Sequence, residues 1–345
     1  MGKPPHGTVR SLKPEEWPLP DQEAWKWACR PNGRLTRGGN AAHLSPATRA
    51  DLECRYGLFL NYVMRTSGLV MGGNPGSSVT SDLVSGYVAE LEKRVASVTV
   101  HGSIAKLRRM TQLLDPAADL KWLSDIENDL ALDMTPASKF NRVVESEIIV
   151  LAGLALMEEA MDAITRTPLQ RARAYRNGLM ISLLALSPIR LKNFSSLTLD
   201  RDFIQIGADW CIALSARETK ERRPDERPIP PFFTRYIDAY LKIYRPTFGY
   251  AGKELWVGIY GMPLSYLGVE RIVTETTRQT LGIPISPHLF RACGASTAYM
   301  HGGTRPNLAS ALLNHRDPKI TQEHYNRSRS AFYGRAFEKL LDTTP

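Results

Sequence analysis

The chain has 345 residues, a length that fits two ordinary domains better than one. Hydrophobic residues make up 43% of it, which is enough to build cores and excludes wholesale disorder. The formal net charge of +9 favours a polyanionic partner, with nucleic acid first and an anionic membrane surface second. The alternative interpretation, that the positive charge only aids solubility, stays open.

Residues 1–44 are expected to form an irregular extension of unknown role. This stretch holds six prolines and a basic, glycine-rich piece from Arg30 to Gly39. Prolines at this density interrupt helices and strands, so the pattern predicts an arm outside the folded core.

Residues 45–134 are expected to form a helical domain. Ser45 and Pro46 suit an N-cap and a first helical turn, and Gly68 suits the stop. Apolar spacing predicts three more helices, at about 81–96, from a Thr99 cap to 115, and at 120–132. The helix that begins with the Thr99 cap exposes a basic face. A generic helical bundle with solvated charges is an open alternative here.

Residues 135–144 resemble a linker, and residues 145–345 are expected to form a second domain. A strong helix at 169–186 ends at Ser187 and Pro188. Two β-like runs at 203–206 and 210–214 and a polar loop then predict a small antiparallel hairpin sheet. The remaining apolar patterns predict helices at about 232–244, 265–281, 290–301, 308–313 and 331–341. The fold class is therefore mainly α with a small antiparallel β-sheet.

Localisation signals and metal motifs are missing from the sequence patterns. The cysteines are Cys29, Cys54, Cys211 and Cys293, and no two have zinc-knuckle or redox spacing. No apolar stretch follows the N-terminal charges, and no apolar run reaches the length of a membrane span. These features predict a cytoplasmic protein with reduced thiols.

Chemically informative residues occur in order along the second domain. Phosphodiester transfer without a metal needs guanidinium groups for the phosphate oxygens, a hydroxyl nucleophile, a proton acceptor and a proton donor. The chain supplies these types as Arg190, Lys220, His288, Arg291, His315 and Tyr325.

The local settings strengthen this set. Pro287–Thr297 contains H-x-x-R at the expected start of a helix, where positions i and i+3 share a face. His315 comes ten residues before Tyr325, and Arg190 follows directly after a buried helix. These three motifs, in this order, resemble the tyrosine site-specific recombinase (phage integrase) family, which is associated with mobile genetic elements.

The resemblance covers about residues 145–330 and implies an N-terminal core-site DNA-binding domain before a catalytic domain. Glu218-Thr-Lys220 resembles the β-hairpin that carries the family's lysine. Three positions depart from the family pattern. Pro188 stands where glycine is frequent, Asn193 where an acidic residue is frequent, and Asn314 where glycine commonly precedes the histidine.

The resemblance also implies a mechanism that needs neither cofactor, metal nor ATP. Tyr325 would attack the scissile phosphate and form a 3′-phosphotyrosyl link. Arg190, Arg291 and His315 would hold the phosphate. Lys220 would protonate the leaving 5′-oxygen, and His288 would help to deprotonate the tyrosine.

The implied partner is a double-stranded DNA recombination site, bound by four protomers on two sites, with room for accessory DNA-bending proteins. Candidate phosphate contacts are Lys106, Arg108, Arg109, Lys139 and Arg142. An apolar stripe in the tail helix, including Phe332 and Leu340, could dock on a neighbouring protomer or on its own domain.

Three other readings stay open. They are a type IB topoisomerase-like enzyme, a DNA-binding regulator of the same fold without catalysis, and a basic metabolic enzyme with a chance constellation. His324 is assigned to packing or DNA contact. Tyr333 is a poorer nucleophile candidate than Tyr325 because it lies 18 residues after His315.

Overall fold

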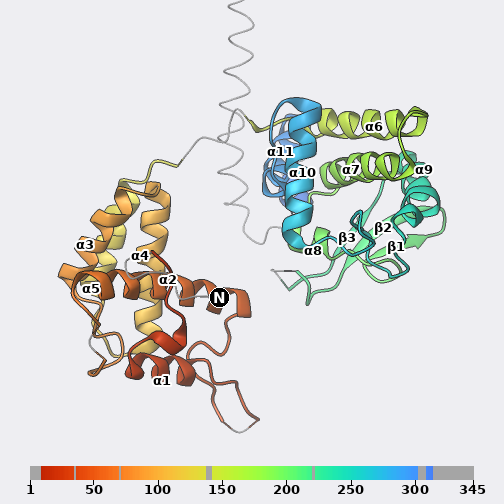
Figure 1. Cartoon of the computed structure of the whole chain (residues 1–345). Helices are drawn as coiled ribbons and strands as arrows, with labels where there is room; N and C mark the ends of the chain where they lie inside the picture. The colour runs from red at the N-terminus through yellow and green to blue at the C-terminus, as the bar shows by residue number, and fades with distance from the viewer. Residues whose placement is uncertain are drawn as a thin grey trace, which may run out of the picture. The chain divides into compact units, whose positions relative to one another are not determined.

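The computed structural model describes residues 9–34, 36–69, 71–136, 142–219, 222–301 and 308–313. The chain forms two compact units, Met1–Ala137 (unit 1) and Ser138–Pro345 (unit 2), each with its own core. Figure 1 shows the helices and strands of each unit. None of the helices within the described ranges combines the length and the apolar character needed to cross a bilayer.

Unit 1 is built from helices around a central one. Its longest helix, α2 (Pro46–Thr66), begins where expected, because the Ser45 side chain accepts a hydrogen bond from the backbone N–H of Thr48 and Pro46 fills the first turn. It ends at Thr66, and the chain turns away two residues later at Gly68, whose φ of 79° suits glycine. The other helices are α1 (Leu19–Ala28), α3 (Ser81–Glu92), α4 (Ser97–Leu114) and α5 (Lys121–Leu132). Helix α4 contacts all the others.

The expectation of an irregular arm over residues 1–44 is wrong for the described part of that stretch. A short 3-10 helix (Pro14–Glu16) precedes α1, and Leu12, Trp17 and Trp25 are buried in the core of unit 1. Trp17 packs edge-on against Tyr56 with ring centroids 5.0 Å apart. Several of the prolines lie at helix starts, where the backbone N–H that proline lacks would have no partner within the helix. Here these prolines therefore mark the starts of helices in a folded segment.

A buried polar link ties this N-terminal segment to the rest of unit 1. The Asp21 carboxylate accepts hydrogen bonds from the Tyr56 hydroxyl and from the backbone N–H of Gly76, both at 2.7 Å. Burial raises the pKa of Asp21 above its ordinary value.

The predicted Thr99 cap is also wrong, because α4 begins at Ser97 and Thr99 lies in its first turn.

Unit 2 has a helical body. Its helices are α6 (Ser146–Asp162), α7 (Pro168–Leu186), α8 (Leu191–Ser195), α9 (Pro231–Ala239), α10 (Tyr266–Leu281), α11 (Pro287–His301) and α12 (Leu308–Leu313). Helices α6 and α7 run side by side (Figure 1). Gly153 and Gly178 allow this approach, since a Cβ at Gly178 would lie 2.6 Å from the carbonyl oxygen of Gly153.

The small sheet of unit 2 is antiparallel, with strand order β1 (Phe203–Ile206), β2 (Asp209–Leu214) and β3 (Asp225–Pro228). Gly207, with a φ of 63°, turns the chain between β1 and β2. The loop after β2 leads to Lys220 and then to β3. The predicted fold class, mainly α with a small antiparallel sheet, is therefore confirmed.

Two helix boundaries in unit 2 differ from expectation. The helix expected over 232–244 is α9 followed by a π-helical turn (Tyr240–Tyr244) and a 3-10 turn (Pro246–Phe248). The helix expected from 290 begins at Pro287. The helix predicted at 331–341 lies outside the described residues.

Candidate active site

Three of the six predicted catalytic residues lie in the described part of the chain. These are Arg190, His288 and Arg291. Lys220, His315 and Tyr325 lie outside it, as does the DNA-contact candidate Lys139. The chain is described up to Thr219, directly before Lys220, and up to Leu313, two residues before His315.

Arg190 sits at a sharp junction between two helices. Helix α7 ends before Pro188, which cannot continue it, and Arg190 is the N-cap residue of α8. Its carbonyl oxygen accepts hydrogen bonds from the backbone N–H groups of Asn193 and Phe194, at 2.9 and 3.0 Å. The neighbouring side chains of Ile189 and Phe194 are buried. The backbone of Arg190 is thus held from both sides, and its side chain is half-exposed.

His288 and Arg291 occupy the first turns of α11. The H-x-x-R spacing does lie at the start of a helix, as expected. His288 is exposed, whereas Arg291 is 7% exposed and the side chains of Leu289 and Phe290 are buried between them. The motif therefore combines one outward imidazole with one inward guanidinium.

Arg291 connects separate motifs through backbone carbonyls. Its Nη1 donates to the carbonyl oxygen of Pro188 at 2.7 Å, and its Nη2 donates to that of Leu313 at 2.6 Å. Pro188 lies two residues before Arg190, and Leu313 lies two residues before His315. One guanidinium thus holds both the loop that leads to Arg190 and the segment that leads to His315. We call this pair of bonds the Arg291 bridge.

Pro188, one of the departures from the family pattern, faces a small residue of α11. A Cβ placed on Gly294 would lie 3.1 Å from Cγ of Pro188 and 3.3 Å from Cδ2 of Leu312. The lack of a side chain at Gly294 makes room for the proline ring. The proline ring at position 188 therefore fits the space that glycine leaves at position 294, next to the Arg291 bridge.

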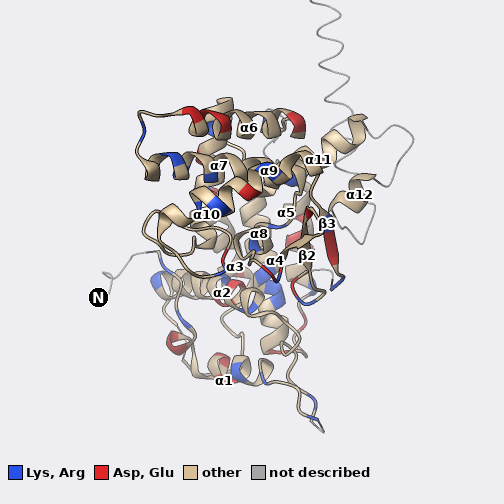
Figure 2. Cartoon of the chain, turned by 90° about the vertical axis from the view of Figure 1, so that its right-hand side faces the viewer, with Lys and Arg blue, Asp and Glu red and all other residues tan. Residues whose placement is uncertain are grey.

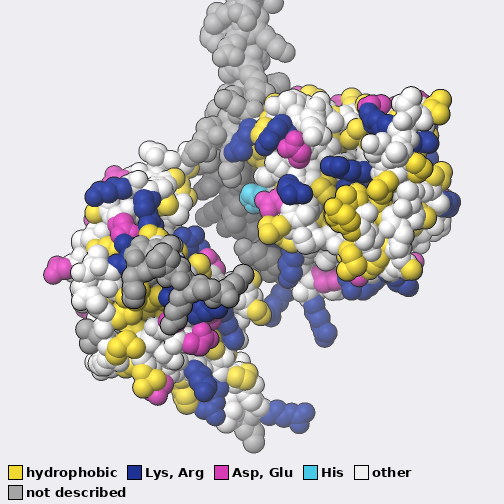
Figure 3. Space-filling model, in the orientation of Figure 1, with side chains coloured by type: hydrophobic (Ala, Val, Ile, Leu, Met, Phe, Trp, Pro, Cys, Tyr) yellow, Lys and Arg dark blue, Asp and Glu magenta, His cyan; other side chains and the backbone are white. Residues whose placement is uncertain are grey.

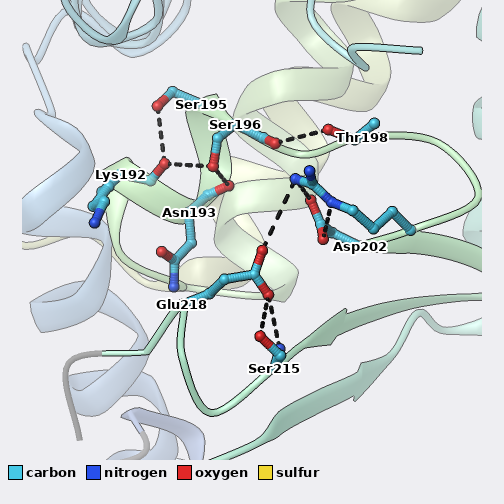
Figure 4. A network of polar contacts seen from close by, with 9 residues as sticks. Lys192, Asn193, Ser195, Ser196, Thr198, Asp202, Ser215 and Glu218 are labelled. Carbon is cyan, nitrogen blue, oxygen red and sulfur yellow. Dashed lines mark hydrogen bonds and ion pairs between the residues drawn. The ribbon is translucent and has the colours of Figure 1, made fainter. Parts of the chain in front are cut away.

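Asn193, the second departure, is also buried. Its backbone carbonyl accepts hydrogen bonds from the N–H and the hydroxyl of Ser196, at 3.2 and 3.3 Å, and the hydroxyl of Ser196 also donates to the carbonyl of Lys192 (Figure 4). These contacts close the short helix α8 behind Arg190. The neutral amide side chain of Asn193 thus lies in the interior, close to Arg190 in the sequence.

The loop that carries Lys220 is tied on both sides of that residue. Before it, the Glu218 carboxylate accepts hydrogen bonds from the N–H and the hydroxyl of Ser215, at 2.9 and 2.8 Å (Figure 4). These bonds lower the pKa of Glu218. Across it, the Thr219 hydroxyl donates to the carbonyl of Arg223 at 2.6 Å and accepts from its N–H at 3.0 Å. The described residues on either side of Lys220 are therefore held by hydrogen bonds.

Ion pairs link this loop to the start of the sheet. Arg201 bonds to the buried Asp202 through two nitrogens, at 2.8 and 2.6 Å, and lies 3.9 Å from Glu218. Among the described residues, no three His, Cys, Asp or Glu side chains are grouped as a metal site would require.

The candidate DNA contacts on α4 are partly engaged within unit 1. Lys106 pairs with Asp51 of α2 at 2.5 Å, and Arg108 pairs with Glu127 of α5 at 2.5 Å. Arg109 is exposed, as is Arg142 of unit 2. Their role in DNA binding stays a prediction.

Comparison with known proteins supports the fold. No family model matches the chain, and no curated protein matches it. Among solved structures, the XerH site-specific recombinase bound to its difH substrate in a pre-cleavage complex is similar, with a TM-score of 0.53 and 15% identity. That match covers 81% of this chain and 76% of the other.

The Tn1549 transposon integrase is also similar. Its complex with transposon right end DNA gives a TM-score of 0.51 at 12% identity, covering 91% of this chain and 98% of the other. Its complex with circular intermediate DNA gives 0.51 at 15% identity, covering 88% and 94%. The chain has the tyrosine recombinase fold. In this fold, the described part of the candidate site is the junction of α7, α8, α11 and α12.

Proposed function

We propose that the protein is a site-specific DNA recombinase that cuts and rejoins strands through a covalent bond to Tyr325. The observation that supports this most is the Arg291 bridge. It joins the backbone two residues before Arg190 to the backbone two residues before His315. A shared anchor of this kind would keep the phosphate-binding groups in register with the tyrosine that follows His315.

The proposed reaction balances without an external energy source. The Tyr325 oxygen attacks the scissile phosphorus, a tyrosyl–phosphate bond forms, and the bond from phosphorus to the 5′-oxygen breaks. His288 accepts the phenol proton, and Lys220 gives a proton to the leaving oxygen. Arg190, Arg291 and His315 stabilise the negative charge of the transition state. A 5′-hydroxyl of a partner strand then reverses the step.

The buried position of Arg291 fits this role. A guanidinium carries five N–H donors in a planar fork, and the two carbonyl bonds use two of them. Those bonds fix the plane of the group before DNA arrives, so little reorganisation is needed when charge develops. We further propose that four protomers act on two DNA sites in the cytoplasm, as part of a mobile genetic element.

The test is trapping of the covalent intermediate. The protein is incubated with a duplex carrying a nick beside the scissile phosphate, and the product is examined for a denaturant-resistant protein–DNA adduct. Wild type should form the adduct, and Tyr325→Phe should not. An adduct with Tyr325→Phe would show that another residue is the nucleophile.

Two further results separate the neighbouring functions. DNA binding without any adduct would favour a regulator that has the fold but not the chemistry. Supercoil relaxation without recombinant products would favour a topoisomerase. Lys220→Ala should cleave a normal site poorly and recover on a 5′-thiol leaving group, since a thiolate leaves without protonation; no recovery would remove Lys220 as the general acid.

A further inference from the structure

The connection between α1 and α2 lies in a stretch of unit 1 whose charged side chains are all cationic. From Ala24 to Ala50 there is no Asp or Glu. The cations within it are Lys26, Arg30, Arg34, Arg37 and Arg49. Figure 1 shows this connection as a long loop reaching away from the helices of unit 1, and Figure 2 shows the Lys and Arg colour along it. A local excess of this size favours a polyanionic ligand.

The Arg30–Gly39 loop has an ordered base. The N–H of Gly39 donates to the carbonyl of Arg30 at 2.9 Å, and the N–H of Gly38 donates to the side chain of Asn32 at 2.8 Å. A Cβ on Gly39 would lie 2.1 Å from the carbonyl oxygen of Trp27, so the close return of the chain requires glycine there. The described residues at the two ends of the loop are therefore held together by backbone and side-chain hydrogen bonds.

Two of the cations hold this loop in place. The Nη2 of Arg49 donates to the carbonyl of Ala42 at 3.0 Å. The guanidinium of Arg30 lies over the ring of Trp27, with its central carbon 5.0 Å from the ring centroid. These residues contribute to the shape of the loop.

The other two loop arginines, Arg34 and Arg37, are exposed. Within the described ranges, neither side chain has an ion pair or a hydrogen bond. On α4, by contrast, Lys106 and Arg108 are already paired with carboxylates. Figure 3 shows Lys and Arg side chains standing out from the surface at the end of the loop. The loop therefore presents charge that needs no internal bond to be broken before a ligand binds.

We infer that the Arg30–Gly39 loop binds the sugar–phosphate backbone of duplex DNA through Arg34 and Arg37. This inference rests on the proposed function, since a recombinase must hold a duplex while its other unit reacts. The planar guanidinium matches paired phosphate oxygens, and flanking glycines let the loop backbone come close to a strand. The contact reads no sequence; it adds affinity and orientation.

The test compares Arg34→Ala/Arg37→Ala with a matched control, Lys93→Ala/Arg94→Ala, which removes the same charge from the end of α3 in the same unit. The dissociation constant for a duplex is measured between 50 and 200 mM salt. The loop variant should bind at least about 12-fold more weakly at 50 mM salt. Because each phosphate contact adds about 0.9 to the salt slope, wild type should lose about 12-fold more affinity over this range than the variant.

The control should keep the wild-type slope. An Arg34→Lys/Arg37→Lys variant should keep most of it, because both charges remain. Wild-type affinity and slope in the loop variant would overturn the inference. So would a loss equal to that of the control, or a loss of binding only to phosphatidylserine vesicles.

The outcome is separable from that of the proposed function. At saturating protein, the loop variant should still form the Tyr325 adduct to the wild-type extent, because it leaves unit 2 unchanged. If wild type forms no adduct, the recombinase proposal fails while the salt slopes still report on the loop. Thermal unfolding at the wild-type temperature shows that the variant is folded.

Discussion

Arginine is used differently in the two units. In unit 2, the buried Arg176 and Arg291 donate to the backbone carbonyls of Val257 and Pro188, which lie 81 and 103 residues away in the sequence. The buried Arg245 donates to the carbonyl of Glu254, nine residues further on, and the buried Arg227 pairs with the carboxylate of Asp225. In the described part of unit 1, no arginine is buried. There, Arg65 and Arg108 pair with carboxylates near the surface.

The difference follows from the cost of burying charge. A guanidinium removed from water loses its hydration, and burial lowers the pKa of Arg176 to about 10. Bonds to carbonyls offset that cost only if the geometry is fixed, so a buried arginine acts as a cross-link. An arginine at the surface keeps its hydration, so its charged form is not destabilised and it stays available to a ligand. The buried arginines of unit 2 that donate to carbonyls thus position groups, whereas exposed arginines of unit 1 can bind a ligand.

The largest effect should come from Arg291→Lys. Lysine keeps the charge but cannot span the carbonyls of Pro188 and Leu313. We expect adduct formation to slow by about 10²–10³-fold, through loss of preorganised donors. We also expect the free energy of unfolding to fall by about 1–3 kcal/mol, because a buried carbonyl loses its donor. Single-turnover cleavage and urea unfolding measure the two quantities.

The control for this variant is Arg201→Lys, whose side chain is 60% exposed and pairs with Asp202. It should change the cleavage rate by less than about fivefold, because lysine keeps the charge and the Arg201 side chain is largely exposed. Cleavage and unfolding of Arg291→Lys at wild-type values would mean that the bridge does not position the motifs.

A smaller effect is expected from adding one methyl group at matched helical glycines of the two units. Gly294→Ala should lower the free energy of unfolding by about 1–3 kcal/mol and slow cleavage, because its Cβ meets Pro188 and Leu312. Gly102→Ala on α4, with open space around it, should raise stability by about 0.5–1 kcal/mol.

Adding Pro188→Gly to Gly294→Ala should recover part of the lost cleavage rate, and a double-mutant cycle measures the coupling. Additive losses from the two substitutions would contradict the complementary fit of these positions.

The smallest effect should come from Arg108→Ala. Its ion pair with Glu127 is partly exposed, so its removal should cost at most about 1 kcal/mol of unfolding free energy. Urea unfolding at low and high salt measures it, and the difference should shrink as salt rises. A loss as large as that of Arg291→Lys would erase the contrast between the two units.

Much of the fold follows from local sequence signals. The cap at Ser45, the proline at 46 and the glycine at 68 predicted α2 closely, and two β-like runs separated by turn residues predicted β1 and β2. These features depend on neighbours in the chain. The order of Arg190 and His288-x-x-Arg291 likewise predicted a shared site, and the Arg291 bridge joins their two segments.

The remaining features depend on contacts distant in sequence. The burial of Leu12 and Trp17 needs α2, so a proline-rich stretch looked irregular when taken alone. Tryptophans at 17 and 25 were the available signal, because rings of that size are rarely left in water. The carbonyl bonds of Arg291 and the fit of Gly294 to Pro188 leave no periodic trace in the sequence.

The Arg291 bridge also bears on the timing of folding. Its two acceptors lie 103 residues before and 22 residues after the arginine. On a ribosome, where the chain appears from its N-terminus, the second bond must wait until Leu313 has been made and has left the tunnel. Contacts this distant form late in folding because loop closure must come first. A growing chain can therefore fold unit 1 and most of unit 2 long before its arginine is locked in place.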